Sequence, residues 1–427
     1  MRTLLLLIGT NPLPNWVTLR ALRGVPYLQL YAPERAVLLH TAETREQARV
    51  LQEHAQQCWS TGLTVECFPL GSAYDAQTID TDVRRCLEQL GKGVDLHLNY
   101  TGGTKQMAVI ATRAFERFLG EHRDIQGRVS YLDPREFRLR IVDRRNQPLL
   151  DSEDLRKSVQ EDFATLVALH GFNILHRADG KVKGADPQIL DVFARELRDR
   201  LIQDHPFSDT WKKYAREVKD KLCDARPSET DRLPFFDDPL GARLFEAFKL
   251  PKGATVAGLY DAQEANNRDD REDARKRFAN FVDGGWLEIL AFHAVKECAP
   301  RVWEVAQGLQ AKPIKAEKKE QLDFETDILV LVGYQLIVLS CTTAQERSHV
   351  KSKGFEVLRR AQQLGGDEAR ALLLTLQPPE FCEKLEQDLA GGSSSNAGRA
   401  HVKVWGKQEV CDLNGFWDRY CREGGLV

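Results

Sequence analysis

The sequence predicts an α/β protein made of two successive α/β parts. The first 150 residues alternate short apolar runs with amphipathic stretches, which is typical of a mainly parallel sheet covered by helices on both faces. A second α/β pattern follows near the C-terminus, after a stretch of mixed-charge helices. The chain has 427 residues, and about 150 residues per domain gives two or three domains. We therefore divide it at 1–150, 151–270 and 271–427.

Composition excludes several classes of protein. With 42% hydrophobic and 29% charged residues, the chain is neither disordered nor collagen-like nor a membrane protein, and no run approaches the roughly 18 apolar residues of a spanning helix. A formal charge of -3 excludes a globally basic nucleic-acid coat but not a local basic groove. Nine scattered cysteines without a CxxC pair indicate neither a disulfide framework nor a zinc site. We expect a cytoplasmic protein.

Five apolar runs in the first part have the length and the flanking turn residues of strands; they are residues 4–8, 36–40, 64–69, 94–99 and 128–132. Amphipathic stretches between them predict helices over residues 42–58, 79–90 and 104–119. Residues 137–142 are expected to return as an antiparallel edge strand. The alternation predicts a Rossmann-like sheet.

The pattern changes after residue 150. One helix is expected over residues 152–171, further helices over 186–224, a connector over 225–241 and a solvated helix over 261–277. An apolar helix then begins in Gly284-Gly285-Trp286-Leu287-Glu288. After it come a hairpin of residues 327–332 and 335–340, a helix over 352–364, and strands at 372–376 and 402–405. The segment 391–398 (GGSSSNAG) predicts a flexible loop.

The most informative motif of the first part is NYTGGTKQMA, residues 99–108. A strand ends, Gly102 and Gly103 turn the chain, Thr104 can cap a helix, and Lys105 stands in its first turn. Free amides and the positive dipole end favour an anion there, and a lysine in that turn, unfavourable for the dipole, suggests a bound negative charge. The loop after the first strand, GTNPLPN (residues 9–15), would complete the site. A plain Gly-Gly turn with an incidental lysine is the alternative. Neither a Walker motif nor GxGxxG is present.

GTNPLPN and NYTGGTKQMA together resemble the CRISPR-associated Rossmann fold (CARF) sensor family. The resemblance implies a homodimer that binds a cyclic oligoadenylate, with cyclic tetra-adenylate the favoured ring, although no residue selects ring size. It implies ligand contacts from seven residues: Thr10, Asn11, Thr101, Gly102, Gly103, Thr104 and Lys105. A two-fold axis would place two such sites around one ring of phosphates.

The second part carries an acidic constellation. Glu288 lies early on the apolar helix, and Glu325 and Asp327 are alternate residues at a strand start, so their side chains share one face. Converging carboxylates can hold a divalent ion for phosphodiester hydrolysis. Taken singly, Glu288 can equally be a capping or surface carboxylate, and the ExD pair a surface edge.

The order of acidic helix, acidic hairpin and helix resembles the PD-(D/E)xK nuclease fold joined to a CARF domain. Ser340 and Thr342 stand where that family has an acidic residue and a lysine. Lys351 or Lys353 could replace the missing cation, and we choose Lys353, just before Gly354, where the chain could bend inward. Glu346 and Glu356 would be spare ligands but are better explained as surface carboxylates.

The resemblance implies a cyclic-oligoadenylate-activated endonuclease of type III CRISPR antiviral defence, dependent on magnesium or manganese. Glu288, Asp327 and Lys353 would be catalytic, and Glu288, Glu325 and Asp327 would hold the metal. The substrate would be single-stranded DNA, RNA or nicked duplex DNA, and no membrane is involved. Two alternatives stay open: a sensor or regulator whose degenerate second half binds nucleic acid or a protein without cutting, and a sensor domain that slowly cleaves its own activator with Lys105 and Thr10.

Overall fold

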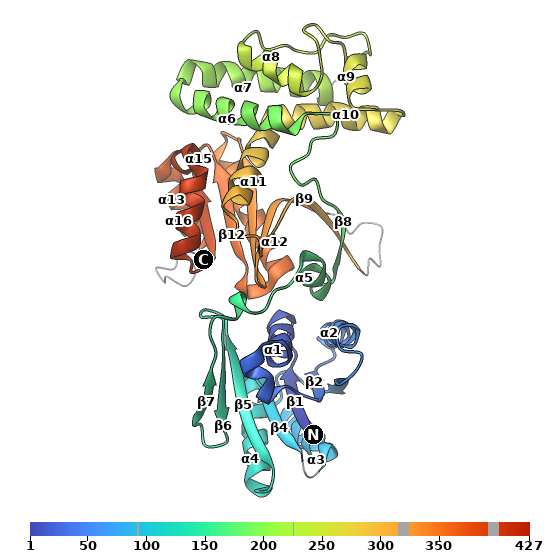
Figure 1. Ribbon diagram of the computed structural model, residues 1–427, viewed down its shortest axis with the longest axis vertical. Coiled ribbons are helices and arrows are strands. Elements are labelled where there is room, and N and C mark those ends of the chain that lie inside the picture. Colours follow the sequence, from blue (N-terminus) through green and yellow to red (C-terminus); the bar gives the residue numbers. More distant parts are fainter. Residues whose placement is uncertain (92–93, 225, 315–323, 392–400) are drawn as a thin grey trace.

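The computed structural model describes residues 1–91, 94–224, 226–314, 324–391 and 401–427, and these form an elongated molecule of three stacked layers (Figure 1). A first sheet lies at one end, a second sheet in the middle, and a layer of helices at the other end. None of the described helices combines the length and the apolar character that a membrane crossing requires. The expected flexible loop at 391–398 lies outside the described residues except for its first residue.

The first sheet has seven strands in the order β3-β2-β1-β4-β5-β6-β7. The five strands from β3 to β5 are parallel, and β6 and β7 continue the sheet antiparallel. Their bounds are Arg2–Leu7 (β1), Arg35–His40 (β2), Thr64–Pro69 (β3), Asp95–Asn99 (β4), Gln126–Asp133 (β5), Arg138–Asp143 (β6) and Pro148–Asp151 (β7). This is the Rossmann-like sheet that the sequence predicts, edge strand included.

Helices cover both faces of this sheet because its central strands are apolar on both. In β1, Leu4 and Leu6 enter one core and Leu5 and Leu7 the other. Helices α1 (Leu13–Gly24) and α2 (Arg45–Cys58) contribute to the first core, and α3 (Ala76–Leu90) and α4 (Lys105–Glu121) to the second. A short 3₁₀ helix (Pro26–Tyr31) follows α1. Helix α1 was not predicted, since two prolines within residues 9–15 suggested a loop; both lie at its start, where proline is tolerated.

The second sheet has six strands in the order β13-β12-β11-β10-β9-β8. The strands β8 to β11 are antiparallel neighbours, and β12 and β13 run parallel to β11. Their bounds are Phe172–His176 (β8), Glu304–Pro313 (β9), Phe324–Val332 (β10), Gln335–Thr342 (β11), Arg370–Thr375 (β12) and Val402–Trp405 (β13). The hairpin β10–β11 is the predicted one, with its turn at Gly333-Tyr334. Strands β8 and β9 were not predicted.

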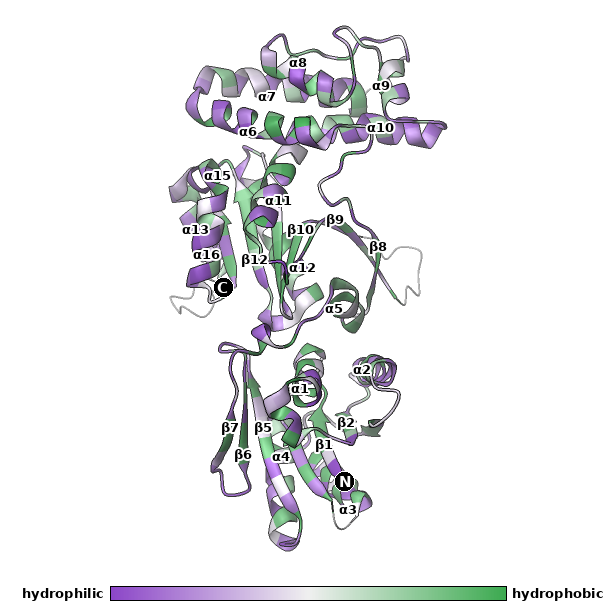
Figure 2. Ribbon diagram, in the orientation of Figure 1, coloured by the Kyte–Doolittle hydropathy of each residue, from purple (hydrophilic) through white to green (hydrophobic). Residues whose placement is uncertain are grey.

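Helices flank this sheet and form the third layer. Those packed near the sheet are α5 (Phe163–Leu169), α11 (Trp286–Cys298), α12 (Arg347–Gly365), α13 (Pro379–Leu389), α15 (Lys407–Cys411) and α16 (Leu413–Glu423). The helical layer consists of α6 (Pro187–Gln203), α7 (His205–Lys219), α8 (Pro239–Ala247), α9 (Val256–Ala262) and α10 (Arg268–Asn280). Figure 2 shows the strands of both sheets as largely hydrophobic and the outer helix faces as hydrophilic. The helical layer is inserted in the chain between β8 and β9. Strand β8, which falls within residues 151–270, belongs to the second sheet. The division into three parts therefore stays a proposal.

The single helix expected over residues 152–171 is wrong. The chain instead makes a 3₁₀ turn at Leu155–Lys157 and starts α5 only after Asp162 caps it. The reason is the close approach of the β10–β11 turn: a Cβ on Gly333, whose φ is +63°, would lie 2.3 Å from the Arg156 carbonyl oxygen. The predicted C-terminal stop is confirmed, because Gly171 adopts a φ of +84° directly after α5.

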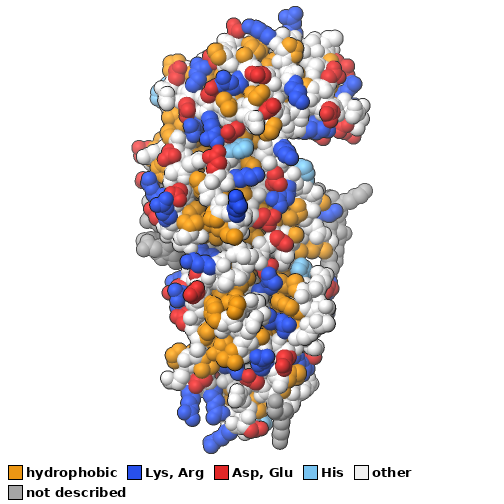
Figure 3. All heavy atoms as spheres, in the orientation of Figure 1, with side chains coloured by type: hydrophobic (Ala, Val, Ile, Leu, Met, Phe, Trp, Pro, Cys, Tyr) orange, Lys and Arg blue, Asp and Glu red, His pale blue; other side chains and the backbone are white. Residues whose placement is uncertain are grey.

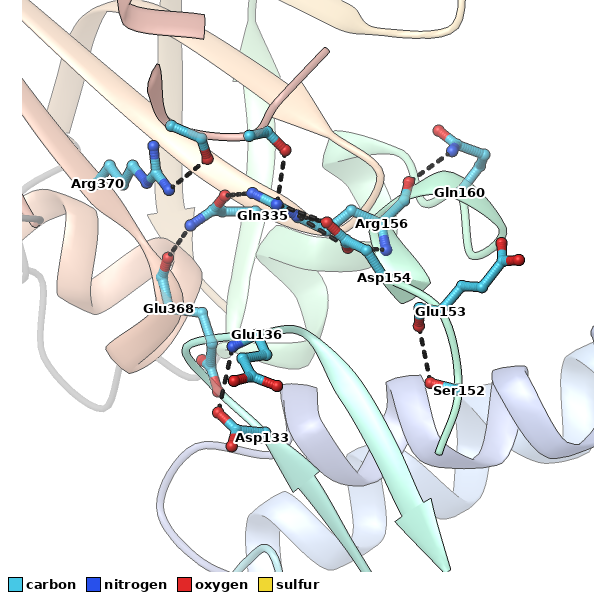
Figure 4. A network of polar contacts seen from close by, with 12 residues as sticks. Asp133, Glu136, Ser152, Glu153, Asp154, Arg156, Gln160, Gln335, Glu368 and Arg370 are labelled. Atoms are coloured by element: carbon cyan, nitrogen blue, oxygen red, sulfur yellow. Dashed lines mark hydrogen bonds and ion pairs between the residues drawn. The ribbon is translucent and has the colours of Figure 1, made fainter. Parts of the chain in front are cut away.

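Arg156 joins the two sheets where their layers meet (Figure 4). Its side chain is only 7% exposed. Its guanidinium donates to Asp154 Oδ2 at 2.6 Å, to Gln335 Oε1 at 2.8 Å and to the Gly425 carbonyl oxygen at 2.8 Å. It also lies over the Phe137 ring, 4.0 Å from the centroid. One side chain therefore connects β11 and the C-terminus with the end of the first sheet.

We expect Arg156→Ala to destabilise the protein by about 3–5 kcal/mol, because it leaves Asp154 and Gln335 partly buried without their partner. Urea unfolding followed by tryptophan fluorescence measures the change. Arg422→Ala is the control: its ion pair with Asp418 is exposed and lies within one helix turn, so about 0.5 kcal/mol is expected. Equal unfolding midpoints for the two variants would contradict the role of Arg156.

Candidate functional site

The two N-terminal loops meet at the carboxyl ends of the adjacent strands β1 and β4. A Cβ on Gly9 would lie 2.8 Å from the Gly103 backbone nitrogen, so the loops are in direct contact. Gly103 has a φ of +75°, which requires glycine at the turn into α4. This edge of a parallel sheet, at the point where the strand order reverses, is where α/β proteins bind ligands.

Thr104 and Lys105 take the positions that the motif predicts. Thr104 Oγ1 accepts a hydrogen bond from the Met107 amide at 3.1 Å, which caps α4, and donates to the Ala73 carbonyl oxygen at 2.9 Å. Lys105 is the first residue of α4, and its side chain is exposed. Thr101 is engaged internally, accepting from the Leu132 amide at 2.8 Å. The cap, the free first-turn amides and the exposed lysine together form a surface suited to an anion.

The two polar residues that follow β1, Thr10 and Asn11, lie in different surroundings. Thr10 is exposed. Asn11 is instead held by the second half of the chain: its Nδ2 donates to Glu368 Oε2 at 3.0 Å, and its Oδ1 lies 3.3 Å from His170 Nε2. Its Oδ1 also accepts from the Leu13 amide at 3.1 Å at the start of α1. These partners hold the Asn11 amide, and the expected contact of Asn11 with a ligand stays a prediction.

Two features of this region were not anticipated. The position of Gly102 requires glycine because of packing, in addition to the close approach of an anion that the sequence predicts. A Cβ there would lie 2.1 Å from the Leu7 carbonyl oxygen and 2.8 Å from Asn15 Oδ1. Asn15, fully buried on α1, donates to that same Leu7 oxygen at 3.0 Å, while its Oδ1 has no partner among the described residues. The second asparagine of GTNPLPN, four positions after Asn11, is the signal that could have found it.

In the second sheet, Asp327 is held in a fixed orientation by β11. Its Oδ2 accepts from Ser340 Oγ at 2.8 Å and from the Cys341 amide at 2.7 Å. Burial raises the pKa of Asp327 despite the lowering effect of these two bonds. Ser340, which replaces the acidic residue of the PD-(D/E)xK pattern, therefore acts here as the donor that orients Asp327. The sequence analysis identified Ser340 only as a departure from the family pattern and did not predict this bond.

Glu288 approaches Asp327 from α11. A π-helical turn, Phe281–Gly285, joins α10 to α11, and Thr343 Oγ1 donates to the Asp283 carbonyl oxygen at 2.6 Å, which fixes this turn to the end of β11. Burial, together with the carboxylates of Asp327 and Glu325, raises the pKa of Glu288 to about 8. The helix thus presents a carboxyl group to a second one, and within the described residues neither carboxyl group forms an ion pair.

Glu325 lies at the edge of this pair. Its side chain is exposed, and its Oε2 is 3.5 Å from Gln310 Nε2, on the neighbouring strand. Among the residues that the structure describes, no three His, Cys, Asp or Glu side chains come together closely enough to hold a metal ion. The structure therefore brings Glu288 and Asp327 together and leaves Glu325 beside them.

The two candidate lysines differ clearly. Lys353 Nζ pairs with Glu356 Oε2 at 3.0 Å, whereas Lys351 Nζ pairs with Asp388 Oδ2 at 2.8 Å on α13. Burial lowers the pKa of Lys353, but Glu356 and then Asp327 and Glu288 raise it, and on balance it lies above its ordinary value. Lys353 is thus in the electric field of the two carboxylates. The expected inward bend at Gly354 does not occur, because α12 continues through it and Leu389 packs against the glycine.

The residues present fit a hard divalent cation. Glu288 makes no hydrogen bond or ion pair within the described part of the chain, and Asp327 uses only Oδ2 in the hydrogen bonds given above. Magnesium commonly binds proteins through one or two carboxylates, keeping its remaining positions for water and substrate phosphate. A cation between two carboxylates of raised pKa would relieve their repulsion. Glu288 and Asp327 are the residues that would hold it.

The segment that carries this site is similar to a known endonuclease domain. Residues 272–409, which include Glu288, Asp327 and Lys353, match the family described as the Card1-like endonuclease domain. The match begins within α10 and ends within α15, so it covers less than half of the chain. Curated proteins give no significant match to the sequence.

Two solved structures share the fold of the whole chain. Protein VC1899 from Vibrio cholerae has a TM-score of 0.66 and 15% identity, with 100% of this chain and 99% of that chain covered. Can2 from Sulfobacillus thermosulfidooxidans, in complex with cyclic tetra-adenylate, has a TM-score of 0.61 and 16% identity, covering 98% of this chain and 99% of that one. The resemblance to a CARF nuclease is thus confirmed as a fold and, over residues 272–409, as an endonuclease-domain family.

Glu368 provides a pH-dependent test of the contact with Asn11. Burial raises the pKa of Glu368 to about 7, with Asp367 adding to the effect and the bond from Asn11 opposing it. A glutamate in an unfolded chain titrates near 4.3, so the folded protein holds a proton between these values that the unfolded chain releases. Stability therefore falls as pH rises from about 4.5 to about 7.

We expect Glu368→Gln to remove this fall, so that its stability relative to the parent increases by about 2–3 kcal/mol between pH 5 and pH 8. Urea unfolding at the two pH values measures it. Glu423→Gln, at an exposed position near the C-terminus, should show no such increase. A pH-independent difference between Glu368→Gln and the parent would contradict the burial of this carboxyl group.

Proposed function

We propose that the protein is a metal-dependent endonuclease, switched on by a cyclic oligoadenylate in type III CRISPR defence. The observation that supports it most is the pairing of Glu288 with Asp327, within a segment that matches an endonuclease domain. Magnesium or manganese is the expected cofactor, and nucleic acid the substrate. A PD-(D/E)xK arrangement with a displaced lysine is the form of site that we assign to it.

Each residue of the proposed centre has a role that follows from its contacts. Asp327 offers its Oδ1 oxygen in a direction set by Ser340 and the Cys341 amide. Glu288 supplies the opposing carboxylate from α11. Lys353 places its ammonium group toward the same point, held there by Glu356, and would neutralise charge that develops on the scissile phosphate. A bound divalent ion supplies an activated water and charge neutralisation in hydrolysis of this kind.

The N-terminal site is proposed to bind the activator. Can2 was solved with cyclic tetra-adenylate, and this chain shares its fold. Lys105, the cap at Thr104 and the two glycines offer positive charge and free amides to a phosphate. Two exposed apolar side chains, Tyr74 at 70% and Val109 at 56%, lie beside this site. We assign this apolar face to the homodimer contact that would bring two sites around one ring.

A second candidate function rests on Ser340 and Thr342. Neither hydroxyl supplies the formal charge of the acidic residue and the lysine that they replace. If two carboxylates and Lys353 were insufficient to catalyse cleavage, the protein would be a sensor that does not cut. Its second half would then bind nucleic acid or a protein. Cleavage of the activator by Lys105 and Thr10 stays an alternative: Thr10 lines a pocket together with His170 and Asp367, and Lys105 is not among the residues that line it.

Two variants test the proposal in opposite directions. Asp327→Asn should abolish metal-dependent cleavage and leave activator binding unchanged, because the sites lie on different sheets.

Lys105→Ala should weaken activator binding by about ten- to hundredfold, the effect of one charge-assisted phosphate contact. It should still cut at saturating activator. Calorimetry with cyclic tetra-adenylate and a gel assay on DNA and RNA give both readouts; cutting by Asp327→Asn would remove it from the centre.

Lys353 and Lys351 form a matched pair, two positions apart on α12. Lys353→Ala should lower the single-turnover cleavage rate by about a hundred- to a thousandfold, since one preorganised charge contact is lost. Lys351→Ala should leave the rate nearly unchanged, because its ammonium group is engaged by Asp388 on α13. The rate is measured with activator and metal both saturating. Equal rates for the two variants would show that Lys353 takes no part in the chemistry.

A further inference from the structure

The connection from β8 to α6 forms a tight turn beside the acidic pair. Its residues are Ala178-Asp179-Gly180-Lys181-Val182-Lys183-Gly184, which we call the lysine turn. Asp179 has a φ of +49° and Gly180 of +80°, so the chain reverses sharply there. Figure 1 shows this connection passing from the second sheet to the helical layer.

Gln307 on β9 fixes the lysine turn. The Ala178 amide donates to the Gln307 carbonyl oxygen at 2.8 Å, and the Gly180 amide donates to Gln307 Oε1 at 2.8 Å. In return, the Gln307 amide donates to Asp179 Oδ1 at 3.3 Å. A glutamine that is only 5% exposed thus holds the turn by backbone and side chain, which makes it a fixed part of the structure.

The turn also contacts α11, which carries Glu288, and β9, which pairs with the strand that carries Glu325 and Asp327. On β9, Gly308 stands opposite Asp327, because the flanking pairs of the register are Thr326 with Leu309 and Ile328 with Gln307. A Cβ on Gly308 would lie 2.9 Å from Ala178 Cβ and 3.5 Å from Glu325 Oε1. On α11, a Cβ on Gly180 would lie 2.7 Å from Phe292, one helical turn after Glu288.

Lys181 and Lys183 are exposed on either side of Val182, which packs toward the core. Within the described residues neither lysine takes part in an ion pair, whereas Lys219 and Lys351 are engaged by Asp283 and Asp388. Figure 3 shows the surface hollowed beneath the overhanging end of the helical layer. The turn therefore carries two exposed lysines that make no ion pair within the described residues, on a segment that contacts α11 and β9.

We propose that Lys181 and Lys183 bind backbone phosphates of the nucleic-acid strand that enters the acidic centre. This inference rests on the proposed nuclease function and names residues that would contact the nucleic-acid strand. A nucleic-acid strand is a polyanion, so positive charge near the centre favours its binding, and phosphate contacts position a strand without reading its sequence. Two lysines separated by one residue, on a turn that Gln307 holds, offer that charge.

The test measures binding of fluorescein-labelled single-stranded DNA and RNA by anisotropy, in the full-length Asp327→Asn background with saturating cyclic tetra-adenylate, over a series of KCl concentrations. The slope of log affinity against log salt is negative, and each lost phosphate contact reduces its magnitude by about 0.7 for a single strand. Lys181→Ala with Lys183→Ala should therefore reduce the magnitude of the slope by about 1.4. Lys181→Arg with Lys183→Arg should restore it. The control, Lys212→Ala with Lys213→Ala on α7, makes the same charge change elsewhere and should leave the slope unchanged.

The outcomes separate this inference from the proposed function. An unchanged slope, an equal loss in the control, or no binding of either nucleic acid by the parent would overturn the role of the lysine turn. In the cutting-competent chain, a raised KM with an unchanged kcat for Lys181→Ala with Lys183→Ala supports it. Cleavage by the Asp327→Asn chain would instead overturn the acidic centre, and it would leave the salt slopes to decide on the lysines.

Discussion

Two carboxyl groups that face each other in a partly buried place are the constraint around which the second half of this protein is organised. Glu288 and Asp327 come from a helix and a strand, and burial, together with the neighbouring carboxylates, raises the pKa of Glu288 to about 8. Such a pair lowers stability unless something compensates it. The surrounding structure supplies rigidity: Ser340 and the Cys341 amide orient Asp327, and Thr343 fixes the π-helical turn before α11. A π turn beside a functional residue is a common device for aiming it. The remaining charge is left for a cation and a substrate.

The first sheet is connected to the segment that carries this centre through the contact between Asn11 and Gly366. A Cβ at Gly366 would lie 2.1 Å from Asn11 Nδ2, and the same amide donates to Glu368. Gly366 directly follows α12, which carries Lys353 nearer its other end. A displacement of the loop after β1 must therefore be accommodated at the C-terminal end of the helix that holds the proposed catalytic lysine. Arg156 and Gln335 tie the same region to β11, since Gln335 also donates to the Glu368 carbonyl oxygen at 2.8 Å (Figure 4).

Local patterns predicted most of the first sheet, because its buried strands are continuous apolar runs and its turn residues are glycine, asparagine and proline. They also predicted the hairpin β10–β11 and the cap at Thr104. The patterns failed where tertiary contacts decide: the segment around Arg156 is broken by the approach of Gly333, and β8 and β9 are too mixed in polarity to stand out. In the site, residue types and order pointed to Glu288, Asp327 and Lys353. The partners of Asn11, the bond from Ser340 to Asp327 and the position of the lysine turn depend on contacts between residues 13 to 357 positions apart, which no local pattern encodes.

Ser340 and Lys353 determine how charge would be arranged in the proposed centre. Ser340 carries no charge on β11, and its hydroxyl donates the hydrogen bond that orients Asp327. In the proposed centre the balancing positive charge comes from Lys353 on α12. The position of Lys353 depends on α12, and Gly366, directly after this helix, lies against Asn11. The charge balance of the proposed centre would therefore depend on the contact between Asn11 and the end of α12.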